Sequence, residues 1–464
     1  MDTTEKLHIV MFPWLAYGHT MPFLELSKFL AQRGHQISYI STPKNIGRLP
    51  KLPSHLSSNI TFVEFSLPRV HGLPSGAEST SEVPIDKVPY LKKAYDQLQV
   101  PLTEFLNNSN VNWIIHDFAP YWLPEISTPL GINLVFFSIL TATVFVILGP
   151  PSVLLGDTRK WPEDFTVVPE WIDYPCNIAW KLHELVNHQQ CMDDDVSDLQ
   201  RLGLAIQGCQ FVTKRTCYEF EPDEIKLLTK LYQKPVIPLG LLPPSLPSNE
   251  DERDENWEAI KSWLDAKGEK SVIYIAFGSE VNLSAESIRQ LALGIEKSNL
   301  PFVWVVRKRP MGEGQMDSHQ DLIPPGLEER VSNRGLVLRD WVPQVRILAH
   351  SSIGGLFTHC GWSSVIEALK FGRPSILFSG ACSDQGLNAR LFHARKVGLE
   401  IERNEVDGSF TSDSVAETIR QVMVEPEGEA IRKKAWAMRE IFDNEELNKD
   451  YLDRFSRFIE DFAA

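Results

Sequence analysis

Residues 341–385 concentrate side chains that could bind a phosphorylated ligand. A short apolar run ends at His359, and Gly361, two serines and a helical pattern follow it, which predicts a strand, a tight turn and a helix. A helix N-terminus presents unpaired backbone N–H groups and the positive end of the helix dipole, so a diphosphate placed there needs few cationic side chains. Gly361 would let the backbone approach this ligand, while His359, Ser363 and Ser364 would donate hydrogen bonds to it.

The same segment carries groups suited to the rest of a nucleotide sugar. Trp341 could stack on a flat base and Gln344 could hydrogen-bond its edge, while Glu367, one turn into the predicted helix, could hold a ribose diol. Asp384 and Gln385 would then meet the hydroxyls of the sugar. Any one of these residues alone fits an ordinary doubly wound sheet, with Trp341 in its core. Their joint occurrence in this order favours a nucleotide-sugar site.

Two residues of the first half could transfer a proton, because each follows a predicted strand. His19 lies just beyond the carboxyl end of strand 7–13, and Asp117 lies at the carboxyl end of strand 111–118. Such a pair forms a base and its orienting carboxylate, and a neutral imidazole is suited to taking a hydroxyl proton near neutral pH. The alternative is a helix-capping His19 and a satisfied strand-end Asp117. His116 would point to the opposite face of its strand, which makes it the weaker candidate.

Together these residues resemble the signature box of plant family 1 UDP-sugar-dependent glycosyltransferases, and the resemblance covers almost the whole chain. It implies the GT-B fold, an α/β architecture in which two Rossmann-like domains face each other across a cleft. It also implies inverting transfer from a UDP-sugar co-substrate, with His19 as general base, Asp117 as its partner, and neither a metal nor another cofactor. The residues that we expect to bind the UDP-sugar are Gly18, Ser279, Trp341, Val342, Gln344, His359, Gly361, Trp362, Ser363, Ser364, Glu367, Asp384 and Gln385.

Two positions depart from the family pattern. Ser363 stands where the family usually has Asn, and this shorter donor would reach the diphosphate less well or through water. Between Pro374 and Gln385 the chain is one residue longer than usual, and the loop 379–383 lacks the customary proline, which alters the segment that positions Asp384 and Gln385.

The acceptor side depends on aromatic residues of the variable N-terminal loops, which would suit a flat apolar molecule, although core packing is the ordinary role of each. They are Trp14, Tyr17, Tyr90, Phe118, Tyr121 and Phe145. The stretches 12–19, 41–45 and 240–245 look like the branch that extends the sugars of flavonoid or terpenoid glycosides. We therefore expect UDP-glucose and a hydrophobic glycoside as substrates. Alternatives are transfer to an aglycone, UDP-rhamnose as donor, a nucleotide-sugar epimerase, and a sugar-nucleotide binding protein without catalysis.

Composition limits other classes of function. The 464 residues carry a net charge of −15, which argues against nucleic acid or an anionic membrane as partner, and 43% hydrophobic with 23% charged residues is typical of a globular protein. Six cysteines without paired spacing indicate reduced thiols and a cytoplasmic location.

Polar residues interrupt the apolar stretch 132–148, which favours a buried strand and helix over a membrane span. The aspartates 193–195 predict a solvated helix start, not a metal site, and we expect a monomer.

Apolar runs of strand length alternate with helical patterns throughout, which is typical of parallel sheets covered by helices. The pattern and the resemblance predict an acceptor-binding Rossmann-like domain (1–240), a proline-rich acidic linker (241–256), a UDP-sugar-binding Rossmann-like domain (257–442) and a helix that crosses back to the first domain (443–464). The predicted strands are 7–13, 36–42, 61–67, 111–118 and 133–139 in the first half, and 271–278, 302–307, 335–341, 354–359, 375–378 and 398–401 in the second.

Overall fold

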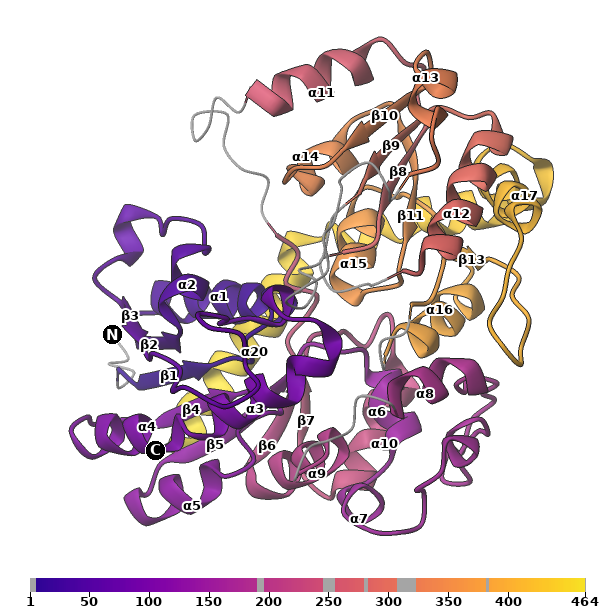
Figure 1. Cartoon of the computed structure of the whole chain (residues 1–464). Helices are drawn as coiled ribbons and strands as arrows, with labels where there is room; N and C mark the ends of the chain where they lie inside the picture. The colour runs from indigo at the N-terminus through magenta and orange to yellow at the C-terminus, as the bar shows by residue number, and fades with distance from the viewer. Residues whose placement is uncertain are drawn as a thin grey trace.

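Two parallel β-sheets organise the chain. The computed structural model describes residues 6–189, 196–244, 255–278, 283–306, 323–380 and 384–463. The first sheet has the strand order β3-β2-β1-β4-β5-β6-β7, and the second has the order β10-β9-β8-β11-β12-β13. Figure 1 shows the sheets in two separate lobes, the N-terminal lobe in indigo to magenta and the C-terminal lobe mainly in orange. The two Rossmann-like units predicted from the sequence are thus confirmed.

Every pair of neighbouring strands is parallel, so helices cover both faces of each sheet and the strands are largely apolar. The first sheet consists of β1 His8–Phe12, β2 Gln36–Ser41, β3 Ile60–Glu64, β4 Trp113–His116, β5 Asn133–Ser138, β6 Phe211–Lys214 and β7 Val236–Pro238. The second consists of β8 Val272–Ala276, β9 Phe302–Val305, β10 Gly335–Leu338, β11 Ile353–Thr358, β12 Ser375–Leu377 and β13 Gly398–Glu400.

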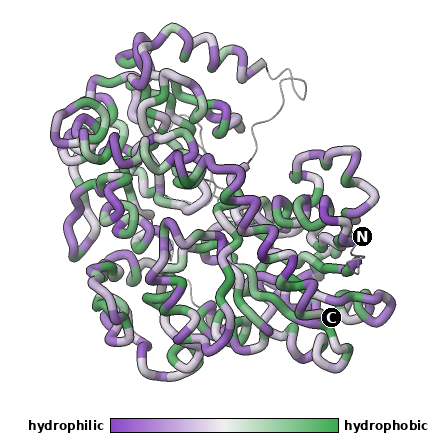
Figure 2. Tube along the Cα trace, turned by 180° about the vertical axis from the view of Figure 1, so that it is seen from behind, coloured by the Kyte–Doolittle hydropathy of each residue, from purple (hydrophilic) through white to green (hydrophobic). Residues whose placement is uncertain are grey.

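Helices connect these strands in both halves of the chain. Those between β1 and β7 are α1 Tyr17–Gln32, α2 Pro43–Gly47, α3 Val88–Asp96, α4 Gln99–Asn107, α5 Leu123–Ser127, α6 Ala142–Leu148, α7 Pro151–Leu154, α8 Leu182–Gln189, α9 Asp198–Gly208 and α10 Pro222–Tyr232. Those that follow β7 are α11 Glu255–Asp265, α12 Ala285–Ser298, α13 Leu327–Val331, α14 Gln344–Ala349, α15 Trp362–Lys370, α16 Gln385–Ala394, α17 Ser412–Met423, α18 Glu429–Ala437, α19 Arg439–Phe442 and α20 Glu445–Ala463. Most strand residues are buried hydrophobic side chains, and Figure 2 shows green, hydrophobic stretches within both lobes.

The sequence prediction of the first sheet was incomplete, because it omitted β6 and β7. β6 is only four residues long and ends in the polar pair Thr213 and Lys214, which breaks the apolar run. The fully buried Lys214 is accommodated by a hydrogen bond from its Nζ to Ser138 Oγ (2.9 Å) on the neighbouring β5. β7 has only three residues and ends at Pro238, so it lacks an apolar run of strand length.

The C-terminal helix α20 lies against the first sheet, although it follows the second sheet in the chain. Figure 1 shows this helix in yellow across the N-terminal lobe. The ring of Phe211 on β6 lies 4.9 Å from that of Phe458 and 6.2 Å from that of Phe455, both on α20 (centroid distances). Aromatic contacts therefore hold the end of the chain to the N-terminal lobe.

Residues 132–148, the apolar stretch considered as a membrane span, form β5 and α6 with the turn between them. Among the described residues, helices that combine the length and the apolar character needed to cross a membrane are absent. Most of the predicted linker, residues 245–254, lies outside the described residues.

Candidate active site

Each sheet reverses its strand order once, between β1 and β4 in the first sheet and between β8 and β11 in the second. In open parallel sheets a ligand binds beyond the carboxyl ends of the strands at such a switch point. His19 follows β1 and Asp117 follows β4, while Gly278 follows β8 and His359 follows β11. The residues predicted for catalysis and for the diphosphate therefore lie at the two switch points.

His19 and Asp117 form a hydrogen-bonded pair, with Nδ1 of the imidazole 2.6 Å from Oδ2 of the carboxylate. Two backbone N–H groups hold the carboxylate: Trp14 donates to Oδ2 (3.2 Å) and Phe118 donates to Oδ1 (2.7 Å). The Asp117 side chain is 3% exposed and that of His19 is 19% exposed. A carboxylate only accepts hydrogen bonds, so Nδ1 of His19 carries the proton and Nε2 is the basic nitrogen.

His19 occupies the first turn of α1, in which the neighbouring Gly18 is exposed. A Cβ atom built on Gly18 would meet nothing within 4 Å, so there is open space beside the base. His116, in contrast, is 1% exposed and stacks on Phe136, with ring centroids 6.0 Å apart. Burial lowers the pKa of His116 to about 4, which makes it a neutral core residue at neutral pH.

Three of the aromatic residues predicted for the acceptor lie near the base. The ring of Phe118 is 6.1 Å from that of His19, and Tyr17, on the first turn of α1, is 49% exposed. Trp14 is 4% exposed and packs its edge on Phe118 at 5.9 Å. Tyr17 and Phe118 therefore offer accessible apolar surface, and Trp14 supports Phe118 from the core.

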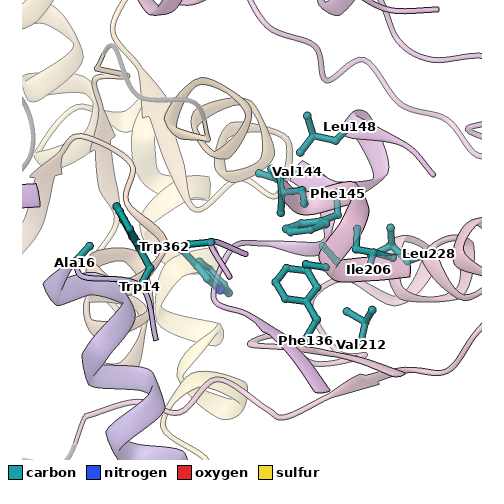
Figure 3. Packing of buried hydrophobic residues seen from close by; sticks show 14 of the residues in the cluster. Trp14, Ala16, Phe136, Val144, Phe145, Leu148, Ile206, Val212, Leu228 and Trp362 are labelled. Atoms are coloured by element: carbon teal, nitrogen blue, oxygen red, sulfur yellow. The ribbon is translucent and has the colours of Figure 1, made fainter. Parts of the chain in front are cut away.

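The other three aromatic residues have different surroundings. Phe145 is 1% exposed inside the hydrophobic core that Figure 3 shows, with Nζ of Lys214 at 3.4 Å from its ring centroid. It cannot contact an acceptor in this packing, which corrects the sequence prediction. Tyr121 carries the Arg201 guanidinium 4.9 Å above its ring, and Tyr90, like Tyr121, is partly buried.

The predicted strand, turn and helix of the diphosphate site are present as β11, a short loop and α15. Gly361 is the N-cap of α15, and Cys360 before it has φ 68°, a left-handed conformation that turns the chain sharply. The His359 ring is enclosed by glycines, because a Cβ atom would come within 2.7 Å of it at Gly278 and within 2.6 Å at Gly361. Burial lowers the pKa of His359 to about 4, so at neutral pH the ring is uncharged and would meet a ligand through a hydrogen bond, not as a cation.

Gln344 joins the groups predicted for the base and the ribose. Its Nε2 donates to Glu367 Oε2 (2.8 Å) and lies 3.3 Å from Ser364 Oγ, and its Oε1 accepts from the Tyr274 hydroxyl (3.2 Å). Burial raises the pKa of the Glu367 carboxyl. These polar side chains of β8, α14 and α15 therefore form one connected cluster.

Trp341 is 58% exposed in the loop between β10 and α14, so its indole is accessible for stacking, whereas the adjacent Val342 is buried at 3% exposure. Two predictions lie outside the described residues: Ser279 in the phosphate-side loop and the aspartates 193–195. Within the described ranges, no three His, Cys, Asp or Glu side chains gather in a group that could hold a metal ion.

Trp362 and Ser363 contact the N-terminal domain. The Trp362 ring is 3% exposed and stacks between Phe220 (5.3 Å) and Phe392 (5.7 Å), and its Nε1–H donates to the Arg215 carbonyl oxygen (2.8 Å). Its side chain therefore belongs to the core shown in Figure 3 and cannot bind UDP-sugar, a correction that leaves only its backbone N–H for a ligand. Ser363 Oγ accepts a hydrogen bond from Arg215 Nη1 (2.6 Å).

The two residues predicted to bind the sugar differ in their environment. Asp384 is the residue directly before α16, and its Oδ2 accepts a hydrogen bond from Asn388 Nδ2 (2.8 Å), while Asn388 Oδ1 accepts one from Thr141 Oγ1 (3.0 Å). Gln385 is 5% exposed, and its Oε1 accepts from the Gly380 N–H (3.0 Å). The side-chain oxygen of Gln385 is thus bonded to Gly380, whereas Asp384 is partly exposed, so of the two predicted groups the Asp384 carboxylate is the more accessible to a ligand.

Sequence reasoning missed three residues that support this site: Arg215, Asn388 and Glu184. Glu184 on α8 accepts from Ser379 Oγ (2.9 Å) and pairs with Arg390. Burial alone would raise the pKa of the Glu184 carboxyl, but Arg390 lowers it. The spacing of Asn388, four residues after Asp384 at the start of a helix, was a usable signal. Arg215 and Glu184 are distant in sequence from their partners, so the local pattern carried no signal for them.

The comparisons with known proteins agree with this geometry. A family model described as UDP-glucoronosyl and UDP-glucosyl transferase matches residues 248–436. UDP-glycosyltransferase 91C1 of Arabidopsis thaliana is 48% identical to this chain, and the match covers 98% of this chain and 97% of the relative. The soyasaponin III rhamnosyltransferase of Glycine max is 39% identical, and the match covers 97% of this chain and 95% of the relative. The solved structure of Glycyrrhiza uralensis UGT73P12 with glycyrrhetinic acid 3-O-monoglucuronide has a TM-score of 0.79 at 21% identity, over 98% of this chain and 96% of that one. The predicted GT-B fold is thereby confirmed, and the chain belongs to the plant family 1 UDP-sugar-dependent glycosyltransferases.

Proposed function

We propose that this enzyme transfers a sugar, glucose in the first instance, from UDP to a hydroxyl of a small hydrophobic glycoside, with inversion at the anomeric carbon. The observation that carries the proposal is the 2.6 Å contact between His19 and Asp117 at the switch point of the first sheet. A base oriented in this way is suited to an acceptor hydroxyl, which must lose its proton as it attacks.

The proposed reaction is a single displacement. Nε2 of His19 takes the proton of the acceptor hydroxyl, the acceptor oxygen bonds to C1 of the sugar, and the bond between C1 and the phosphate oxygen breaks. Asp117 stabilises the imidazolium that forms. The departing UDP carries the electron pair of the broken bond, and the N–H groups at the start of α15 with Ser363 and Ser364 stabilise its negative charge. The mechanism proceeds without a metal and inverts an α-linked donor to a β-glycoside.

Two observations favour a glycoside acceptor over an aglycone. The stretches 12–19, 41–45 and 240–245 resemble the branch that extends sugar chains, and a 39% identical relative is named soyasaponin III rhamnosyltransferase. The same name makes UDP-rhamnose the alternative donor. We further propose a cytoplasmic monomer that has neither nucleic acid nor membrane as partner, in keeping with the net charge of −15.

The test is a mass-resolved transfer assay in which UDP-glucose and UDP-rhamnose are offered separately with flavonoid and terpenoid aglycones and with their monoglucosides. Products on the monoglucosides alone would support sugar-on-sugar transfer, whereas products on the aglycones would identify a first-sugar transferase. His19→Ala should abolish transfer and retain UDP binding. His55→Ala, which changes an exposed histidine on the surface of the first lobe, is the matched control and should behave as the wild type.

A further inference from the structure

Arg215 is a buried cation of the N-terminal domain whose side chain ends at the donor-binding helix of the C-terminal domain. It follows β6 and is 3% exposed. Its guanidinium donates three hydrogen bonds: Nε to the Leu241 carbonyl oxygen (2.8 Å), Nη2 to the Leu242 carbonyl oxygen (3.0 Å) and Nη1 to Ser363 Oγ (2.6 Å). These three acceptors are uncharged.

The guanidinium of Arg215 keeps its charge at neutral pH. Burial lowers its pKa to about 10, while Glu367 and Glu25 oppose this shift by Coulombic attraction. Neither carboxylate belongs to the three acceptors that hold the guanidinium. A buried charge costs free energy when no opposite charge pairs with it, so this site is electrostatically suited to an anion nearby.

Ser363 connects this charge to the start of α15. A guanidinium has no acceptor atom, so Ser363 Oγ must accept from Arg215, and the hydroxyl proton is available for a different partner. Ser363 is partly exposed and is the second residue of α15, where backbone N–H groups have no intrahelical acceptor and the helix dipole favours an anion. The hydroxyl and the helix N-terminus are therefore donors for the same anion.

We propose that Arg215 is a positioning residue for the diphosphate of UDP, which holds Ser363 as a hydrogen-bond donor and lends positive charge to the site from the opposite domain. This inference rests on the proposed function and deepens it. The cation behind Ser363 compensates for the shorter reach of a serine at a position where the family usually has an asparagine. Because the departing UDP gains negative charge as the bond to C1 breaks, the same cation favours that step.

Arg215 also holds the backbone at the start of the interdomain linker, and this structural role must be separated from the proposed one. Asn448 on α20 also holds this backbone, since its Oδ1 accepts from the Leu241 N–H (2.8 Å) and its Nδ2 donates to the Asn444 carbonyl oxygen (2.8 Å). Asn448→Ala therefore loosens the linker without removing the hydrogen bond to Ser363, which makes it the matched control.

The experiment is calorimetric titration of the full-length wild type and of R215Q, R215K, S363A, R215Q/S363A and N448A with UDP, UMP and uridine. R215Q should weaken UDP binding about 10- to 150-fold, the effect of one charge-assisted hydrogen bond, and leave uridine binding within about twofold. S363A should act in the same direction, and the double variant should lose little more than the more damaging single change. R215K, which keeps the charge, should bind UDP more tightly than R215Q does, and N448A should change UDP and uridine binding equally.

Two results would overturn the proposal. Equal weakening of UDP and uridine binding by R215Q would leave Arg215 only its linker role, and wild-type UDP affinity in S363A would show that the hydroxyl makes no phosphate contact. S363A retains the hydrogen bonds from Arg215 to the linker, so UDP binding by this variant tests the proposal even where R215Q fails to fold. Failure of the proposed function gives a different pattern, in which the wild type binds UDP and transfers no sugar to any glycoside.

Discussion

Replacement of Asp117 by asparagine should separate catalysis from binding. The wild-type carboxylate accepts from His19 Nδ1 at 2.6 Å and from the backbone N–H groups of Trp14 and Phe118. Asparagine has the same shape, and its single amide oxygen can still accept a hydrogen bond. The substitution removes the negative charge. The NH2 group of asparagine also favours the imidazole tautomer that carries its proton on Nε2, and a protonated Nε2 cannot act as the base.

The size of the effect follows from these contacts. A hydrogen bond to a charged partner contributes about 1.5–3 kcal/mol, which corresponds to a fall in kcat of about 10- to 150-fold. Loss of general-base catalysis through the wrong tautomer extends this to about 10⁴-fold. The UDP affinity should stay within about twofold of the wild type, because Asp117 belongs to the first sheet and the predicted diphosphate donors belong to the second.

The assay measures kcat at saturating UDP-sugar and acceptor, together with the UDP dissociation constant by calorimetry. The double variant of His19→Ala and Asp117→Asn should be no slower than His19→Ala alone, because Asp117 acts through the base. The reasoning is refuted if Asp117→Asn keeps more than half of the wild-type kcat, or if it weakens UDP binding as much as it lowers kcat.

The stability of the protein should decrease in acid because of His116. The pKa of His116 is about 4 in the folded protein against a reference value of 6.5, so between these values the unfolded state binds more protons and the free energy of unfolding falls as the pH drops from 6.5 to 4. In urea denaturation, this acid-induced fall should be smaller by roughly 3 kcal/mol in His116→Phe than in the wild type. An equal fall in the wild type and the variant would contradict this. Trp362→Ala should lower the free energy of unfolding by roughly 3–5 kcal/mol, because it leaves a cavity between two stacked rings; an unchanged urea midpoint would argue against the buried position. Ser379→Ala should raise KM for the donor sugar roughly fivefold, the effect of one hydrogen bond, because the Ser379 hydroxyl joins the segment before Asp384 to Glu184. UDP affinity should stay unchanged, and parallel loss of both would contradict a role confined to the sugar.

The strands that position His19 and Asp117 could be predicted, because a buried parallel strand is a continuous apolar run with recognisable ends. β6 could not, since Lys214 interrupts its run. That lysine is tolerated because its Nζ bonds to Ser138 Oγ and lies over the Phe145 ring, and both partners come from elements elsewhere in the chain. The pattern of a single strand holds no information about such compensation.

The sequence by itself determined which chemical groups lie in residues 341–385, their order, and the start of a helix directly after Gly361, because local spacing and turn chemistry control these features. Only the tertiary structure decided which of those groups are exposed and which are held by other side chains. The indole of Trp362 is buried between rings of two domains, and Ser363 is bound by Arg215, 148 positions away in the chain. Hydrogen-bond partners and burial depend on which surfaces folding brings together, and this information lies in the packing of distant segments.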